Sequence, residues 1–111
     1  TEQPYLQAVY DVGVSQMALG RVALVGDAAS AARPHAAAGT AKAAANAWAL
    51  HDALSDSADI AEALAKWEPG QLELGQRLLR RVKEMGTRSQ VDCTWVPGDP
   101  DNRFGLYGPG H

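Results

Sequence analysis

The sequence predicts a mixed α/β segment in which one or two strands precede three mainly Ala- and Leu-rich helices and an irregular tail. Three observations lead to this fold class. A short apolar run at residues 21–25 lies between glycines, strong helix formers dominate residues 40–86, and Pro and Gly crowd residues 97–111. Short apolar runs bounded by glycine are typical of strands, whereas long stretches of helix formers favour helices.

Two strands are predicted, over about residues 5–10 and over residues 21–25. The first contains two Tyr and a Val in loose alternation with polar residues, which is typical of a half-buried strand. The second, RVALV, is apolar at consecutive positions, which predicts burial on both faces. Between them, the sequence Asp11-Val12-Gly13 has the composition of a turn.

The first predicted helix covers residues 40–54. Its sequence, TAKAAANAWALHDAL, contains almost only helix formers, and either Gly39 or Thr40 can cap its start. The preceding residues 28–38 are small and include Pro34, so we expect a loop or a short helical turn there. We expect Lys42, in the first turn of the helix, to be solvated, and Trp48 to pack between helices.

Two further helices are predicted over residues 60–68 and 70–86. Asp59 can cap the first of them, with Glu62 at its third position. Pro69 either begins the next helix or kinks one continuous helix. Apolar residues then recur at three- and four-residue steps, which predicts one buried stripe made of Leu72, Leu74, Leu78, Leu79, Val82 and Met85. We expect residues 1–90 to form one structural unit and residues 91–111 an irregular tail.

Composition excludes several classes of protein. The 46% of hydrophobic residues include 21 Ala, whereas Leu, Val, Ile and Phe together also number 21, so the chain has little material for a core of its own. The net charge of −3 argues against a nucleic-acid binder, and no apolar run approaches the length of a membrane span. No His, Cys or carboxylate cluster has the spacing of a metal site. The single cysteine, Cys93, and the missing signal peptide predict a cytoplasmic protein.

The residues after the second strand allow two interpretations, an ordinary turn before a closely packed Ala-rich helix or a ligand site. Gly26 allows close approach of another group, and Asp27 places two acceptor oxygens at the end of a strand. The run Ala36-Ala37-Ala38-Gly39 has no bulk, so a flat ring can approach its backbone. The helix that follows directs free N–H groups and partial positive charge at whatever lies there.

At these residues the chain resembles the FAD-dependent aromatic hydroxylases. Residues 20–29, GRVALVGDAA, look like the second flavin-binding signature of that family, with Pro34 and Gly39 at the positions of its downstream Pro and Gly. Residues 32–54 and the tail RFGLYGPG are similar to the branch that hydroxylates 2,6-dihydroxypyridine. The resemblance implies a C-terminal part of a Rossmann-like FAD-binding fold, with NAD(P)H and O₂ as co-substrates and a small aromatic substrate.

The resemblance also implies roles for individual residues. Asp27 would hydrogen-bond the ribityl chain of FAD, and its neighbours would lie along the pyrophosphate. The backbone of residues 37–41 would face the flavin ring. His35 follows Pro34 beside this site, and it either shapes the substrate cavity or is a plain loop residue. No catalytic residue is assigned. The complete set of implied cofactor residues is Gly26, Asp27, Ala28, Ala29, Pro34, Ala37, Ala38, Gly39, Thr40 and Ala41.

The chain departs from the family pattern in three ways. The first glycine of the family's Gly-rich loop falls at Ala36 or Ala37. The usual Asn and Asp of the helix are replaced by Ala41 and Asn46, and no G-x-G-x-x-G turn for the adenine half of FAD occurs. We therefore expect this chain to need the N-terminal portion of the enzyme to hold FAD, and include a homodimer of the full enzyme among the expected assemblies. Two alternatives stay open, namely a cofactor-free helical assembly module and a related flavoprotein with different oxidation chemistry.

Overall fold

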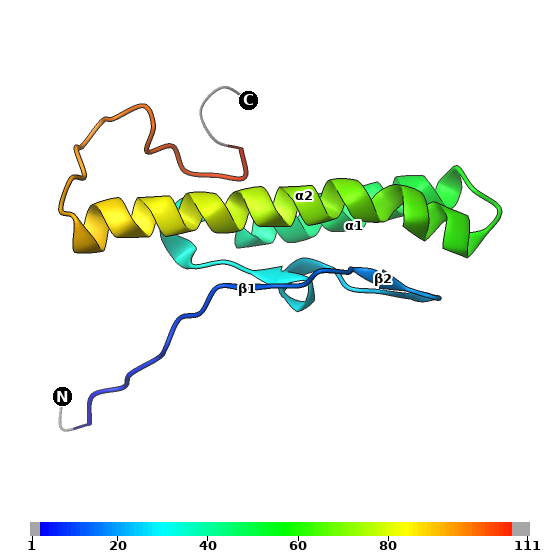
Figure 1. Ribbon diagram of the computed structural model, residues 1–111, viewed down its shortest axis with the longest axis horizontal. Coiled ribbons are helices and arrows are strands. Elements are labelled where there is room, and N and C mark those ends of the chain that lie inside the picture. The colour runs from blue at the N-terminus through cyan, green and yellow to red at the C-terminus, as the bar shows by residue number, and fades with distance from the viewer. Residues whose placement is uncertain (1–2, 108–111) are drawn as a thin grey trace.

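In the computed structural model, which describes residues 3–107, two helices lie against a layer of short strands (Figure 1). Helix α1 spans Gly39–Ser55 and helix α2 spans Ile60–Gly86. The molecule measures 52 × 40 × 20 Å, so its thinnest dimension is about two helix diameters. A body this flat leaves many apolar side chains exposed, as the core-poor composition predicts.

The strands form two small antiparallel pairs. Strand β1 (Val12–Gly13) pairs with β4 (Ser30–Ala31), and β2 (Ala18–Leu19) pairs with β3 (Val22–Ala23). Gly20, at φ +60°, begins the two-residue turn that joins β2 to β3, a conformation that favours glycine. Between β3 and β4 lies the single 3₁₀ turn η1 (Gly26–Ala28).

Both predicted strands need correction. Residues 5–10 form no strand, and Tyr5, Leu6, Val9 and Tyr10 are exposed, because no described residue lies where it could pair with them. Of residues 21–25, only Val22 and Ala23 are in a strand, and Val22 is largely exposed rather than buried on both faces. The turn predicted at residues 11–13 contains β1 instead.

Helix α1 agrees closely with its prediction, but α2 runs through Pro69 without a break. The predicted division into helices over 60–68 and 70–86 is therefore wrong. Pro69 is exposed, and the buried positions Leu64, Trp67, Leu78 and Val82 continue along one face on both sides of it. Burial of this face outweighs the unfavourable effect of a proline inside a helix. The Asp59 cap is confirmed, since its Oδ1 accepts from the Glu62 amide at 3.0 Å.

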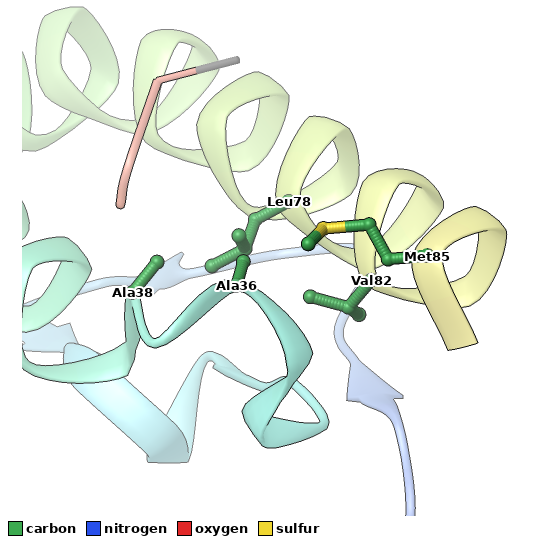
Figure 2. Close-up of a cluster of buried hydrophobic side chains, with 5 residues drawn as sticks. All are labelled: Ala36, Ala38, Leu78, Val82 and Met85. Atoms are coloured by element: carbon green, nitrogen blue, oxygen red, sulfur yellow. The ribbon is translucent and has the colours of Figure 1, made fainter. Parts of the chain in front are cut away.

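The core consists of two clusters along α2. One joins Leu78, Val82 and Met85 of α2 to Ala36 and Ala38 (Figure 2). These two alanines belong to the segment with the 3₁₀ turn η2 (Pro34–Ala36) that precedes α1. The second cluster contains Met17, Ala29, Leu64 and Trp67. The clusters fix the strand layer and the start of α1 against α2.

The C-terminal residues continue from α2 through one π-helical turn, η3 (Thr87–Val91), and then follow an irregular path back over the C-terminal half of α2 (Figure 1). Arg81 donates to the carbonyl oxygen of Gly105 at 2.8 Å, and Trp95 packs against the cluster around Val82. Arg81 therefore holds the tail against α2.

Two glycines of α2 give a matched test of this packing. A Cβ added to buried Gly75 would lie 2.9 Å from Ser30 Oγ, whereas one added to Gly70 would meet nothing within 4 Å. We expect Gly75→Ala to destabilise the chain by about 1–3 kcal/mol, because the new methyl group displaces the Ser30 hydroxyl that accepts from Lys42. We expect Gly70→Ala to stabilise it by about 0.5–1 kcal/mol through helix propensity. Urea unfolding measures both, and two stabilising substitutions would contradict the described contact.

Candidate functional site

The Gly26–Ser30 segment forms a tight turn on the surface of α1. Gly26 has φ +60°, and a Cβ on it would lie 3.3 Å from the Cβ of Ala43. The Ala29 amide donates to the Gly26 carbonyl at 3.1 Å, which closes the turn. The small side chain of Ala43 and the absent side chain of Gly26 together allow this close approach.

Asp27 stands at the exposed tip of this turn. Its carboxylate accepts no hydrogen bond from any residue within 3–107, and Ala28 beside it is also exposed. Ala29, the third residue after Gly26, is buried in the core instead. Asp27 therefore offers two acceptor oxygens to the surroundings, as the sequence predicts for a hydroxyl-binding residue.

The buried residue Asn46 of α1 links the turn to α2 through three hydrogen bonds. Its Oδ1 accepts from the Gly26 amide at 3.1 Å, and its Nδ2 donates to Gln71 Oε1 at 2.9 Å. The indole Nε1 of Trp67 donates to the Asn46 carbonyl at 3.1 Å. The turn, α1 and α2 are thus joined by one polar network.

Lys42 is buried beneath the same turn, not solvated as predicted. Its Nζ donates to the Gly26 carbonyl at 2.9 Å, to Ser30 Oγ at 2.9 Å and to the Ser30 carbonyl. Burial lowers the pKa of the ammonium group, and the nearby Asp27 carboxylate opposes this shift. Sequence reasoning missed Lys42 and Asn46, although both fall in the helical stripe that continues with Ala49, Leu50 and Ala53.

The start of α1 is open. Its N-cap, Ala38, has no side chain that could accept from the first amides, and Gly39, Thr40 and Ala41 are exposed. A Cβ on Gly39 would meet nothing within 4 Å. Ala37 is exposed in the left-handed conformation, at φ 51°, between the buried Ala36 and Ala38. No bulky side chain from the described residues blocks these amides, which carry the partial positive charge of the helix end.

Pro34 and His35, the next two predicted site residues, differ in exposure. Pro34 is exposed at the first position of η2. His35 is half-buried against α2, where a Cβ on Gly86 would lie 3.1 Å from its Cε1 and Nε2 atoms. Its Nδ1 is buried and finds no hydrogen-bond partner within residues 3–107. The structure therefore places His35 at a packing contact with α2, and the predicted role in a substrate cavity remains a prediction.

An ion pair anchors the segment that leads into α1. Arg33 Nε donates to Asp11 Oδ2 at 2.7 Å, the Arg33 amide donates to Asp11 Oδ1 at 2.9 Å, and Arg33 Nη2 completes a two-pronged contact. The hydrogen bonds from Arg33 hold the pKa of the Asp11 carboxyl below its ordinary value near 3.8. The ion pair therefore attaches the N-terminal segment to Arg33, which precedes η2 and the start of α1 in the sequence.

This ion pair predicts a change of stability in acid. Because the folded-state pKa of Asp11 is lowered, its contribution is complete above the ordinary value of 3.8 and is lost as the pH falls through the folded-state pKa. We expect Asp11→Asn to reduce the loss of unfolding free energy between about pH 5 and pH 3 relative to the unchanged chain. Urea unfolding at both pH values measures this difference, and equal losses in the two proteins would contradict it.

Other candidate features lie elsewhere or do not occur among the described residues. A cavity of about 860 Å³ lies between α2 and the tail, and none of the implied cofactor residues lines it. Within residues 3–107, no group of three His, Cys, Asp or Glu could hold a metal ion. In the same range no helix combines the length and the apolar character that crossing a membrane requires.

Taken together, the turn and the start of α1 present complementary chemistry. Asp27 provides acceptors, the first amides of α1 provide donors and positive potential, and small exposed residues leave the backbone between them accessible. Such a surface suits a ligand that combines hydroxyl donors with a flat ring able to carry negative charge. The residues present therefore fit a flavin.

Comparison with known proteins relates the chain to the ring-hydroxylating monooxygenases. It is 43% identical over 103 residues to 2,6-dihydroxypyridine 3-monooxygenase of Paenarthrobacter nicotinovorans, a match that covers 93% of this chain and 26% of the relative. It also matches the structure of 2,6-dihydroxypyridine-3-hydroxylase from Arthrobacter nicotinovorans with a TM-score of 0.81 and 40% identity, over 93% of this chain and 27% of that one. No protein-family model matches the chain.

These matches confirm the resemblance that the sequence motifs indicate, and the mixed helix and strand fold. The chain spans about a quarter of the length of both proteins.

Proposed function

We propose that this chain forms part of an FAD-dependent monooxygenase that hydroxylates an activated aromatic or N-heteroaromatic ring of the 2,6-dihydroxypyridine type. The observation that carries this proposal is the 43% identity over nearly the whole chain to a 2,6-dihydroxypyridine 3-monooxygenase. NAD(P)H and O₂ are the proposed co-substrates. The single cysteine supports a cytoplasmic location.

The turn at Gly26–Ser30 would bind the ribityl and pyrophosphate parts of the cofactor. The Asp27 carboxylate would accept hydrogen bonds from ribityl hydroxyl groups. Its exposure supports this role, as does the absence of any hydrogen bond to its oxygens within the described residues. Gly26 is buried, and its amide and carbonyl groups bond to Asn46 and Lys42, so it would support the turn from inside. The exposed Ala28 would lie beside the pyrophosphate. Ala29 contributes by packing into the core, which fixes the end of the turn.

The start of α1 would face the flavin ring. Ala37 and residues 39–41 are exposed, whereas Ala38 between them is buried in the core. The exposed residues give a flat group access to the first amides of the helix, whose partial positive charge stabilises an anion. When bound, the flavin supplies the redox chemistry that takes electrons from NAD(P)H and activates O₂. The part played by this chain is to bind, orient and electrostatically stabilise that group.

The remainder of the site is proposed to come from polypeptide outside this sequence. The sequence has no G-x-G-x-x-G turn, and the match covers only 26% and 27% of the two similar proteins. The exposed apolar residues of the N-terminal segment and of the β2–β3 hairpin offer a surface for that polypeptide, namely Tyr5, Leu6, Val9, Tyr10, Leu19 and Val22.

A spectrum and a substrate titration test this function. The protein that contains this chain should carry a visible flavin absorbance after purification. Adding 2,6-dihydroxypyridine should accelerate its oxidation of NADH or NADPH and yield a product heavier by one oxygen atom. A purified protein without flavin, or one that oxidises NAD(P)H without hydroxylating a ring, would refute the proposal.

A further inference from the structure

In the part of the chain that the structure describes, the buried ammonium group of Lys42 donates only to the Gly26–Ser30 turn. All three acceptors of its Nζ belong to Gly26 and Ser30, the two residues at the ends of the turn that presents Asp27. Its side chain is almost completely buried, with 1% of its surface exposed, and no carboxylate of residues 3–107 accepts a hydrogen bond from it. The ammonium group therefore acts as a clamp between the two ends of the turn.

Packing alone does not account for this residue. Burying an ammonium group is unfavourable unless hydrogen bonds compensate, whereas an apolar side chain of the same length would fill the same space without that penalty. What Lys42 adds over such a side chain is three donors in one place. These donors set the separation of the Gly26 and Ser30 carbonyl groups, and with it the path of residues 27–29.

Two further contacts hold the ends of the turn that Lys42 joins, one at Gly26 and one at Ser30. Asn46, one helical turn after Lys42, accepts from the Gly26 amide, so Gly26 is held at both its N–H and its carbonyl. Ser30 is pressed against α2 at Gly75, where no side chain larger than hydrogen fits without displacing its hydroxyl. The tip of the turn, in contrast, has no described contact that holds the Asp27 carboxylate. The orientation of Asp27 thus depends on how its two ends are fixed.

We propose that Lys42 is a positioning residue for cofactor binding, and that it acts by holding the Gly26–Ser30 turn so that Asp27 meets the ribityl hydroxyls. This inference rests on the proposed function. It assigns to Lys42 no contact with the cofactor. The effect of Lys42 on flavin affinity therefore passes through Asp27.

A double-mutant cycle in the flavin-binding protein that contains this chain tests the inference. FAD affinity is measured by fluorescence for the unchanged protein, Lys42→Met, Asp27→Asn and the double variant. We expect Lys42→Met to weaken FAD binding about tenfold or more, as for loss of a well-placed hydrogen-bonding group. In the Asp27→Asn background the same substitution should have little further effect, because the group it positions is already impaired.

Controls separate positioning from general loss of structure. Lys66→Met removes an exposed lysine whose ion-pair partner is Glu62, and it should leave FAD affinity unchanged. Ser30→Ala removes one of the three acceptors while keeping the buried charge, so it should weaken FAD binding slightly while the apoprotein stays folded, as its unfolding transition will show. If Lys42→Met does not fold, this milder variant decides the question.

Several outcomes would overturn the inference. One is FAD affinity unchanged in Lys42→Met, or in Ser30→Ala where the first variant does not fold. Another is an equal weakening by Lys42→Met with and without Asp27, because additive effects would mean that Lys42 does not act through that carboxylate. Normal FAD binding by the unchanged protein in these cases would leave the proposed function intact, whereas no FAD binding by the unchanged protein would overturn both.

Discussion

Removal of the Asp27 carboxylate should weaken flavin binding by about 1–3 kcal/mol, which corresponds to about a 5- to 150-fold rise in Kd. The physical reason is the loss of a charged acceptor whose oxygens are free of other hydrogen bonds within residues 3–107. Asp27→Ala changes an exposed side chain at the tip of a turn, so the fold itself should be little affected. Equilibrium titration of the apoprotein with FAD measures the change.

Asp52 provides the matched control for this substitution. It is another exposed aspartate, near the opposite end of α1, and its side chain contacts the neighbouring His51. Asp52→Ala should leave the FAD affinity unchanged. Equal losses for the two substitutions would indicate an effect of net charge, and unchanged affinity in Asp27→Ala would remove Asp27 from the site.

Trp67→Ala should destabilise the chain more than any other substitution considered for it, by about 3–5 kcal/mol. Trp67 is 3% exposed, packs with Met17, Ala29 and Leu64, and donates to the carbonyl of Asn46. Its removal leaves a cavity between α2 and the strands. It also removes the hydrogen bond from the indole to the Asn46 carbonyl of α1. Since small domains have a total stability of about 5–15 kcal/mol, we expect unfolding at much lower urea concentration.

Trp48→Ala is the matched control for Trp67→Ala, because it removes an exposed tryptophan instead of a buried one. Trp48 lies on α1 with 74% of its surface exposed, so the predicted packing of Trp48 between helices is wrong. Trp48→Ala should change the unfolding free energy of the 111-residue chain by less than about 0.5 kcal/mol. Equal destabilisation by the two substitutions would contradict the described core.

The helices were predictable because their signals are local. The Ala-rich composition of α1, the Asp59 cap and the apolar stripe of α2 each act within a few residues of the chain. Continuity through Pro69 was not decided by the sequence, because it depends on tertiary burial of the face around Trp67. The strand predictions were wrong because strand pairing also depends on tertiary contacts, here between residues far apart in the sequence.

The exposed residues of the candidate site could be predicted from the sequence, but the buried side chains that hold them in place could not. Asp27 and the open start of α1 follow from a turn signal and from small residues before a helix. Lys42 and Asn46 support them from inside, and their burial runs against the usual exposure of such residue types. Only the three-dimensional position of the Gly26 and Ser30 carbonyls explains why a lysine is satisfied there.

Hydrogen exchange with and without FAD tests the central claim most directly, in the protein that contains this chain. The account predicts that bound FAD slows amide exchange in residues 26–30 and 37–41, while the exposed far end of α1 exchanges as before. Stoichiometric binding of FAD with unchanged exchange in both segments would contradict the account, because the flavin would then lie elsewhere.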